Sequence, residues 1–284
     1  MAVKRLGVVG SGIMGAGIAE CAARSGHEVV LRSRRQETAD AMVAALDSAL
    51  SRRVHQGKMP PEERVSVLSR VIATTDLERL AECDLVIESI VEDLAAKQHL
   101  FHQLDQVCPE GVILATNTST LPVIELAMAT RRPERVCGIH FFNPAPVMRV
   151  VEIVRPLTAS DETVMECRAF VEACGKQPVE AKDRAGFIVN ALLFPYLNNA
   201  ARMYDAGVAS RDDIDAAMMG GCGFPMGPLA LLDLVGLDTS VAILEVLHRE
   251  LGEPNYAPVA CLRRLVAAGW LGRKSGRGFY DYTA

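Results

Sequence analysis

Two side chains with complementary acid–base chemistry stand out because each interrupts an apolar run. His140 lies within Val136–Phe141, and Glu152 lies within Val151–Val154. An imidazole titrates near neutral pH and can take or deliver a proton. A nearby carboxylate orients such a ring and stabilises its charged form. The pair predicts general acid–base catalysis, and the alternative for His140 is a hydrogen-bonded core histidine.

The remaining histidines lie among polar or helical surface patterns, and we expect them to be solvated: His27, His55, His99, His102 and His248. Two further polar segments accompany the pair. The run Thr116–Thr120 follows a predicted strand, and the run Gly186–Asn190 opens a helical stretch. A polar group at the carboxyl end of a strand in a doubly wound sheet faces the ligand crevice. The run Thr116–Thr120 is therefore a candidate part of the site.

A glycine-rich turn follows the first predicted strand and opens a helix. It comprises Gly10, Ser11, Gly12, Ile13, Met14 and Gly15. The first glycine permits the tight turn, the second lets the backbone approach a pyrophosphate, and the third allows close helix–strand packing. The N–H groups and positive dipole end of the helix then favour an anion. The turn predicts dinucleotide binding.

The end of the second predicted strand lacks the acidic residue typical of NAD sites. That residue normally follows the glycines by roughly 20 positions and binds the ribose 2′-OH. Here the chain reads Leu31-Arg32-Ser33-Arg34-Arg35. A small hydroxyl flanked by guanidinium groups suits a 2′-phosphate. Ser33 and Arg34 therefore predict a preference for NADP(H) over NAD(H), and the alternative is a solvated basic turn.

Short apolar runs alternate with helical stretches such as Gly15–Ser25 and Ala95–Gln106. The predicted strands are Leu6–Val9, Val29–Leu31, Val71–Ala73, Leu85–Ile90, Val112–Ala115, Val136–Phe141 and Val150–Val154. This alternation predicts an α/β fold with a doubly wound, Rossmann-type sheet. From Gly186 the apolar residues recur at helical spacing, so we expect a dinucleotide-binding domain over residues 1–183 and a smaller all-helical domain over residues 184–284.

Composition excludes several classes of protein. The 284 residues carry a formal net charge of −5, which argues against a nucleic-acid binder. No apolar run reaches the roughly 18 residues that span a bilayer, and a strand predicted almost at the start leaves no room for a signal peptide. The eight cysteines include no C-x-x-C pair, and no cluster has metal-ligand spacing. We expect a cytoplasmic protein with reduced thiols and no metal.

Several segments together resemble the L-3-hydroxyacyl-CoA dehydrogenase family, in particular its stand-alone bacterial members that act on 3-hydroxybutyryl-CoA. The resemblance covers nearly the whole chain. It rests on these segments: Gly10–Gly15, Glu88–Glu92, Asn117–Ser119, His140–Pro144, Gly186–Asn190, Pro225–Pro228, Gly236–Thr239 and Lys274–Tyr280. In combination these motifs are highly specific.

The resemblance implies reversible oxidation of an (S)-3-hydroxyacyl-CoA to the 3-oxoacyl-CoA, with hydride transfer to a nicotinamide. It implies that His140 is the general acid–base and Glu152 its partner, while Ser119 and Asn190 bond the substrate oxygen or the catalytic groups. Family cofactor-contact positions fall on Glu92, Lys97, Ser119, Asn143 and Lys274. Ser33 departs from the family, which usually has an acidic residue there.

The resemblance also implies contacts with the CoA nucleotide in a helical insertion between the second and third strands. Ser51, Arg52 and Lys58, with Arg53 beside them, are the candidates, and a solvated charged face is the alternative. The apolar stretch Phe224–Val235, continuing to Leu247, predicts a homodimer through the helical domain.

Two other functions remain open at this point. One is a related β-hydroxyacid dehydrogenase of the L-gulonate type on the same fold. The other is a catalytically idle binding or structural protein, since dehydrogenase folds can be recruited for such roles. The segments His140–Pro144 and Gly186–Asn190 favour the acyl-CoA enzyme over the first, and the intact pair His140 and Glu152 speaks against the second.

Overall fold

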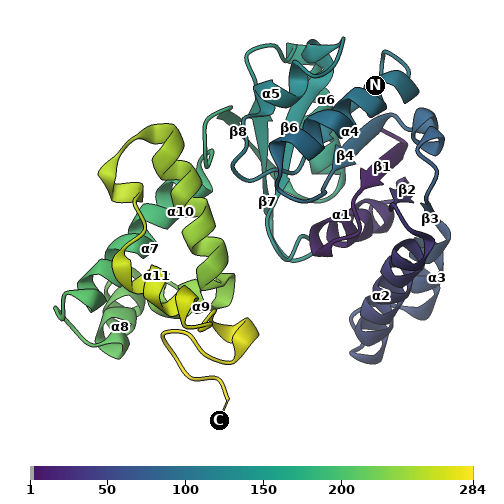
Figure 1. Ribbon diagram of the computed structural model, residues 1–284. Coiled ribbons are helices and arrows are strands. Elements are labelled where there is room, and N and C mark those ends of the chain that lie inside the picture. Colours follow the sequence, from purple (N-terminus) through teal and green to yellow (C-terminus); the bar gives the residue numbers. More distant parts are fainter. Residues whose placement is uncertain (1–2, 284) are drawn as a thin grey trace. The chain divides into compact units, whose positions relative to one another are not determined.

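The computed structural model describes residues 3–283, which form two compact units (Figure 1). The first unit ends at Asp183 and the second begins at Arg184. Each is described below by itself.

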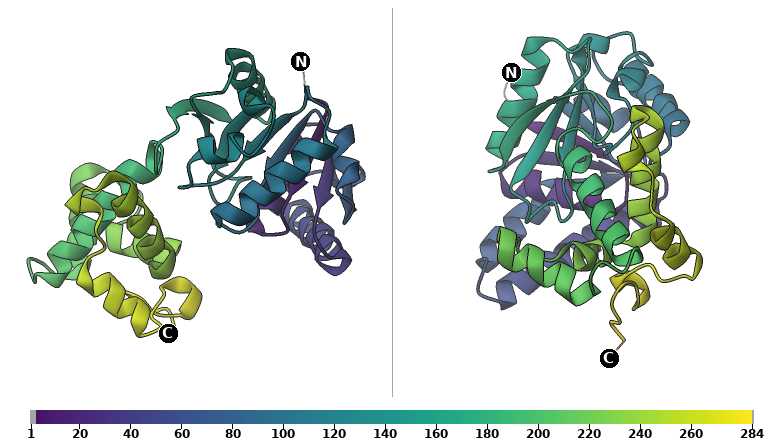
Figure 2. Two further views of the ribbon diagram at one scale, coloured as in Figure 1. Left: turned by 45° about the horizontal axis from the view of Figure 1, so that its top comes forward. Right: turned by 90° about the vertical axis from the view of Figure 1, so that its left-hand side faces the viewer.

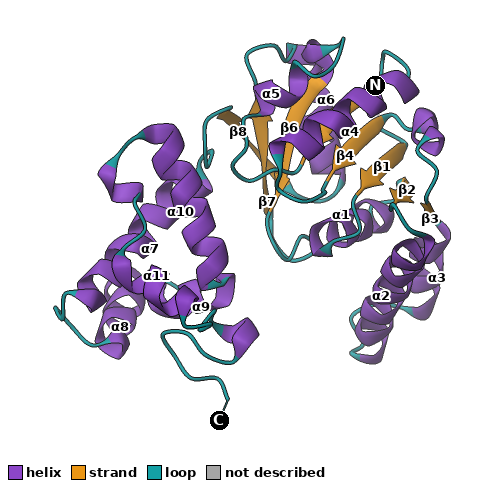
Figure 3. Ribbon diagram, viewed as in Figure 1, coloured by secondary structure: helices purple, strands orange, loops and turns teal. Residues whose placement is uncertain are grey.

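An eight-stranded sheet forms the centre of the first unit (Figure 3). Its order is β3-β2-β1-β4-β5-β6-β7-β8. The strands are β1 (Arg5–Val9), β2 (Glu28–Arg32), β3 (Val71–Thr74), β4 (Leu85–Glu88), β5 (Ile113–Thr116), β6 (Val136–Phe141), β7 (Val150–Arg155) and β8 (Gln177–Lys182). Every residue of β4, β5 and β6 is buried, which explains why these strands are mostly apolar. The predicted doubly wound sheet is confirmed.

Helices cover both faces of this sheet (Figures 1 and 2). Residues of α1 (Ile13–Arg24) and α6 (Asp161–Ala173) share one hydrophobic core with alternate strand residues such as Leu6 and Val8. On the opposite face lie α4 (Leu94–Val107) and α5 (Val123–Ala127). Two 3-10 turns, η1 (Glu78–Glu82) and η2 (Pro133–Arg135), complete the connections.

The insertion between β2 and β3 is a helical pair, α2 (Gln36–His55) and α3 (Pro61–Ser69). Its inner face joins the core through Met42, Leu46 and Leu50. Helix α4 begins where the Asp93 carboxylate accepts a hydrogen bond from Ala96 N at 2.8 Å, a side-chain cap that fixes the first turn.

Two features of the first unit differ from the expectations. The strand β8 was not predicted, because its six residues Gln177–Lys182 are largely polar and only Ala181 is buried at this sheet edge. The other concerns His27, which we expected to be solvated: it is 8% exposed, and its Nδ1 lies 3.0 Å from Val3 O. It directly precedes β2, and its ring packs against that of Phe170 with centroids 5.3 Å apart.

The second unit is helical, as predicted. Its elements are α7 (Val189–Asp205), α8 (Arg211–Cys222), α9 (Pro228–Val235), α10 (Leu237–Leu251), η3 (Pro254–Tyr256), α11 (Ala260–Ala267) and η4 (Arg273–Ser275). The chain end is held by Asp233, 1% exposed, whose carboxylate accepts hydrogen bonds from Phe279 N and Tyr280 N at 2.9 Å each. Within residues 3–283 no helix is both long and apolar enough to cross a bilayer.

Candidate active site

The glycine turn after β1 is shaped by close backbone contacts. Gly10 has φ 135°, and a Cβ added there would lie 2.2 Å from Ser89 O. A Cβ at Gly15 would lie 2.3 Å from Gly10 O, whereas one at Gly12 would meet nothing within 4 Å. The first and third glycines are therefore required by packing, and the second borders open space.

Helix α1 starts directly after this turn. Gly12 is its N-cap and provides no side-chain hydrogen bond to the first turn. Ile13 is exposed and Met14 is half-buried in that turn. The N–H groups at this helix end therefore lie toward the open space, in the arrangement that favours phosphate oxygens.

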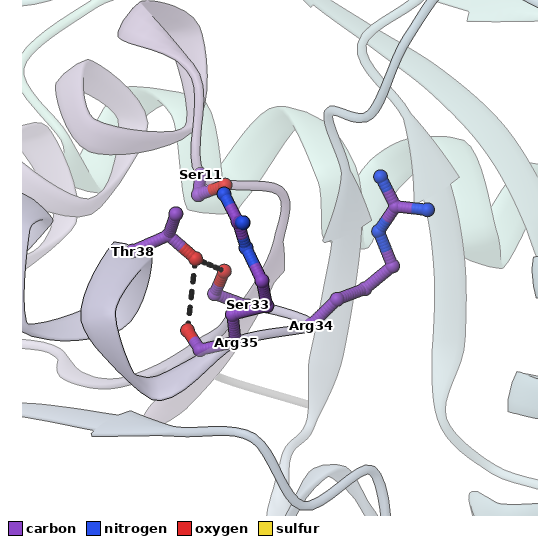
Figure 4. Close-up of a pocket in the computed structure, with 5 residues that line it drawn as sticks. All are labelled: Ser11, Ser33, Arg34, Arg35 and Thr38. Atoms are coloured by element: carbon purple, nitrogen blue, oxygen red, sulfur yellow. Dashed lines mark hydrogen bonds between the residues drawn. The ribbon is translucent and has the colours of Figure 1, made fainter.

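Beside the turn is a hollow of about 410 Å³ at the end of β2 (Figure 4). Its lining consists of three hydroxyl side chains and two arginines: Ser11, Ser33, Arg34, Arg35 and Thr38. The side chain of Arg35 points toward Ser11, whereas that of Arg34 points away from it. Sequence analysis selected Arg34, but in the structure it is Arg35 that points toward the glycine turn.

The hydroxyl of Ser33 is already engaged inside this hollow. Ser33 is 3% exposed, and its Oγ is hydrogen-bonded to Thr38 Oγ1. Thr38 Oγ1 donates its own hydrogen to Arg35 O at 2.8 Å, so Ser33 is the donor to Thr38. In this arrangement Ser33 Oγ retains acceptor capacity, and the donors toward a ligand are the arginine N–H groups.

His140 and Glu152 face each other across the only antiparallel pair in the described sheet, β6 and β7. They are direct partners in its register, and His140 Nδ1 lies 2.7 Å from Glu152 Oε2. The side chains are 7% and 0% exposed, respectively. The ring of Phe142 packs against the imidazole with centroids 4.5 Å apart. A buried carboxylate bonded to Nδ1 is the arrangement that orients a catalytic imidazole.

The loop after β5 carries Ser119 and lies against β6. Asn117 Oδ1 accepts a hydrogen bond from Phe141 N at 2.8 Å, next to His140. Ser119 is half-buried, and its N–H donates to Glu92 Oε1 at 3.0 Å. Asn143 is exposed in the turn that follows β6. These residues therefore gather near the carboxyl edge of the sheet.

Glu92 and Lys97 differ in their access to solvent. The Glu92 side chain is 39% exposed, whereas that of Lys97 is 1% exposed. Lys97 Nζ lies 2.6 Å from Glu88 Oε1 and 3.2 Å from Glu92 Oε2. Partial burial raises the pKa of Glu92, but Lys97 and the hydrogen bonds from Thr118 and Ser119 outweigh it and hold the pKa below its ordinary value.

The residues selected for CoA lie at the end of α2 and just beyond it. Arg52 and Lys58 are exposed, and Ser51 is half-buried. Arg53 instead turns toward Glu20 of α1, with Nε 3.9 Å from Oε1. Two cations at this helix end thus remain accessible to a phosphate, and the third is part of an internal ion pair.

Two selected residues belong to the second unit. Asn190, 8% exposed, lies in the first turn of α7, after Gly186 with φ 76°. A Cβ at Gly186 would lie 2.6 Å from Leu247 Cδ2, which explains the glycine. Lys274 in η4 forms an ion pair with Asp238 at the start of α10, with Nζ 2.6 Å from Oδ1.

The described residues include one exposed cysteine thiol and no cluster of potential metal ligands. Seven of the eight cysteines are buried free thiols, and Cys222 is exposed. It lies at the end of α8, outside the helical core. Residues 3–283 contain no group of three or more His, Cys, Asp or Glu side chains able to hold a metal ion.

Two models of one protein family match this chain. The family model described as 3-hydroxyacyl-CoA dehydrogenase, NAD binding domain, matches residues 5–184. The model for the C-terminal domain of the same family matches residues 186–282. The chain belongs to the 3-hydroxyacyl-CoA dehydrogenase family. It is an oxidoreductase that uses a nicotinamide cofactor.

This 3-hydroxyacyl-CoA dehydrogenase is similar over its full length to bacterial relatives. A probable 3-hydroxybutyryl-CoA dehydrogenase of Bacillus subtilis is 46% identical over 99% of this chain and 98% of the relative. The crystal structure of Mycobacterium tuberculosis FadB2 matches with a TM-score of 0.97 and 46% identity, covering 100% of both chains. That of (S)-3-hydroxybutyryl-CoA dehydrogenase PaaH1 from Ralstonia eutropha matches with a TM-score of 0.96 and 40% identity, again over 100% of both.

Sequence analysis of this dehydrogenase gave no role to Thr38 and Glu88, and it placed Arg35 only behind Arg34 as a further cation. Arg35 and Thr38 line the hollow beside the glycine turn, and Glu88 holds Lys97. One signal was available for Glu88, because a carboxylate that ends a buried strand must have a partner. Nothing in the sequence distinguishes the directions of Arg34 and Arg35.

Proposed function

We propose that the chain interconverts (S)-3-hydroxyacyl-CoA and 3-oxoacyl-CoA, with 3-hydroxybutyryl-CoA as its substrate, by hydride transfer with NADP(H) in preference to NAD(H). The observation that carries the proposal is the buried His140–Glu152 pair, 2.7 Å apart, in a sheet whose first turn suits a dinucleotide. The names of the full-length bacterial relatives support the four-carbon substrate.

In this proposal His140 moves the proton. Its Nδ1–H donates to Glu152 Oε2, so the neutral ring carries its basic lone pair at Nε2. Nε2 takes the substrate hydroxyl proton during oxidation and returns it to the 3-oxo oxygen during reduction. A bound nicotinamide would supply the hydride acceptor for oxidation at substrate C3 and the hydride donor for reduction. Glu152 stabilises the imidazolium that forms, because its carboxylate lies against the ring in a buried position.

Ser119 and Asn190 are proposed to bond the substrate oxygen or the catalytic groups, and Ser119 also to contact the cofactor. Ser119 suits this role because its loop is anchored beside His140 through Asn117. Asn190 suits it because a buried amide at the start of a helix has few orientations open to it. Glu92, Asn143 and Lys274 remain proposed cofactor contacts, and we assign Lys97 an indirect role.

The glycine turn suits the cofactor's pyrophosphate. Gly12 borders open space at the uncapped start of α1, where Ile13, Met14 and Gly15 present backbone N–H groups. The NADP preference is supported by the hollow beside it, where Ser33 occupies the place of the usual carboxylate and Arg34 and Arg35 follow it. Because the side chain of Arg35 points toward Ser11, we propose it as the principal contact of the 2′-phosphate.

We further propose that Ser51, Arg52 and Lys58 contact the CoA nucleotide. The support is the accessible positive charge of Arg52 and Lys58 at the end of α2, which suits phosphate groups. The reduced thiols suit a cytoplasmic location.

A homodimer through the second unit is also proposed. Much of the stretch used to predict it is buried in the unit's own core, including Leu229, Leu232 and Leu244. The support now comes from apolar side chains that remain accessible, among them Leu192 at 71% and Phe224 at 41%. Both lie near Tyr196, which is one helical turn from Leu192 and packs edge-on against Phe224 at 5.5 Å.

Steady-state assays test the proposed reaction. Acetoacetyl-CoA is supplied with NADPH or NADH, and consumption of the reduced nicotinamide is followed. The expected result is turnover that requires the CoA ester and is absent with free acetoacetate. Oxidation of L-gulonate without reduction of acetoacetyl-CoA would favour the sugar-acid alternative. Failure to turn over any hydroxyacyl-CoA would favour a binding protein.

A further inference from the structure

Glu88, at the end of β4, is a fully buried carboxylate that the proposed proton and hydride transfers do not use. It accepts hydrogen bonds from Lys97 Nζ at 2.6 Å, Ile90 N at 2.6 Å and Thr116 Oγ1 at 2.7 Å. Its side chain is 0% exposed. A charged group at such a position requires a matched counter-charge and hydrogen-bonded oxygens, and both are present.

Lys97 connects the buried carboxylate of Glu88 to the carboxylate of Glu92. Its ammonium lies between two carboxylates, 2.6 Å from Glu88 and 3.2 Å from Glu92. Because the side chain is 1% exposed, the ammonium has no open path to a ligand in this arrangement. Its influence on the reaction therefore passes through Glu92, the exposed end of this row of alternating charges.

Glu92 in turn holds the loop that contains Ser119. Its Oε1 accepts hydrogen bonds from Thr118 Oγ1 at 2.5 Å and from Ser119 N at 3.0 Å. An ionised acceptor strengthens such bonds and shortens them. Lys97 supports that ionised state, since its ammonium lies against the other oxygen of the carboxylate.

A second connection leads from Glu88 to the same loop. Thr116 Oγ1 donates to Glu88 Oε2 and accepts a hydrogen bond from Thr118 N at 3.1 Å. The backbone of Asn117 also donates to Glu88 O at 2.8 Å. Glu88 thus holds the start of the loop directly and its Ser119 end through two charged side chains.

We propose that Glu88 is a positioning residue for the dehydrogenase reaction, which sets the backbone of Ser119 through Lys97 and Glu92. The inference rests on the proposed role of Ser119 at the substrate oxygen or the cofactor. Lys97 bridges Glu88 and Glu92. The charge of Glu88 therefore affects turnover, although the residue itself touches no ligand.

A double-mutant cycle in kcat tests this inference. Glu88→Gln in the full-length enzyme is expected to lower kcat by about 10- to 100-fold, because a small displacement of a contact group is enough for such a loss. In a Ser119→Ala background the same change is expected to lower kcat by less than about threefold, since the positioned hydroxyl is already absent. A residue that only stabilises the fold would act equally in both backgrounds.

Asp105→Asn is the matched control. Asp105 lies on helix α4, eight residues after Lys97, is 3% exposed and is ion-paired with Arg132 at 2.8 Å. Both Glu88→Gln and Asp105→Asn are expected to lower Tm, but Asp105→Asn is expected to leave kcat within about twofold of wild type. If Glu88→Gln does not fold, Glu88→Gln combined with Lys97→Met replaces it in the cycle, because both buried charges are then removed together.

Three outcomes would overturn the inference. The first is a wild-type kcat in Glu88→Gln, and the second is an equal loss in both backgrounds. The third is a wild-type kcat in Ser119→Ala alone, which would remove the proposed role of Ser119 and the inference with it. The Ser119→Ala measurement thus separates failure of the proposed function from failure of the positioning role.

Discussion

His140 Nδ1 lies 2.7 Å from Glu152 Oε2, and the two residues are direct partners in the antiparallel register of β6 and β7. Twelve positions separate them in the chain, yet the register brings a base and a carboxylate into contact in a buried strand pair. Because Glu152 accepts from Nδ1, the proposed proton-transfer atom is Nε2. This contact motivates the first two predictions.

Replacing His140 with Gln is expected to lower kcat by roughly 10²- to 10⁴-fold, the usual contribution of a general acid–base. Gln is close in size and can still bond Glu152, so cofactor affinity should change little. The measurement is kcat with acetoacetyl-CoA, together with fluorescence titration of NADPH. Wild-type turnover in this variant would remove His140 from the mechanism.

Glu152→Gln is expected to lower kcat by roughly 10²- to 10⁴-fold as well, for a different reason. The amide N–H₂ of Gln would donate to Nδ1 and favour the tautomer that carries its hydrogen on Nε2. NMR of the ring nitrogens would report this exchange of tautomers. A variant that keeps Nδ1–H and full activity would show that the carboxylate is not needed for orientation.

The cofactor preference is expected to reverse with Ser33→Asp. A carboxylate at the end of β2 would accept a bond from a ribose 2′-OH and repel a 2′-phosphate. One charge-assisted bond contributes about 1.5–3 kcal/mol, which corresponds to a preference of about 10- to 100-fold. The measurement is kcat/KM for NADPH and NADH. Equal ratios in wild type and variant would leave the arginines as a solvated basic turn.

Arg35→Ala separates the two arginines of the hollow. We expect it to raise KM for NADPH at least tenfold and to change KM for NADH little, because the Arg35 side chain points toward Ser11 while that of Arg34 points away. Arg34→Ala is the matched control, with a smaller expected effect. A larger loss in Arg34→Ala would reverse this assignment.

Leu192→Glu is expected to weaken the homodimer, because a charge would lie in an accessible apolar patch beside Tyr196. Leu157→Glu is the control, since Leu157 is 98% exposed in the first unit. Light scattering at micromolar concentration measures the mass of each. A monomeric wild-type enzyme, or a dimer unaffected by the change, would contradict this prediction.

Stability is expected to fall in mild acid because of His27. Burial lowers the pKa of its imidazole below 6.5, only partly offset by its bond to Val3 O. The folded state therefore binds fewer protons than the unfolded chain, so this stabilising contribution is present above pH 6.5 and is lost as pH falls through the lowered pKa. Urea unfolding at several pH values measures how the free energy of unfolding changes with pH. This dependence on pH should be weaker in His27→Gln than in His99→Gln, in which an exposed histidine is replaced. An equal dependence on pH in the two variants would exclude His27 as the cause of the loss of stability in acid.

Much of the site could be predicted from the sequence because its signals are local. The glycine turn needs only six neighbouring residues, and the strands β1 to β7 are recognised from short apolar runs. His140 and Glu152 attract attention because a polar residue in an apolar run must be satisfied or functional. The missing acidic residue at Ser33, on which the proposed NADP(H) preference rests, is also visible within a few residues at the end of the second strand.

The tertiary structure alone decided which of these groups meet. Register between β6 and β7 places Glu152 opposite His140, and a shift by one residue would turn it to the other face. Side-chain direction separates Arg35 from Arg34, and burial places Lys97 between Glu88 and Glu92 rather than at the surface. The sequence determined the local elements and the chemical groups because turns and periodicity depend on neighbours in the chain. The contacts among those groups depend on packing between segments far apart in it, which no local pattern specifies.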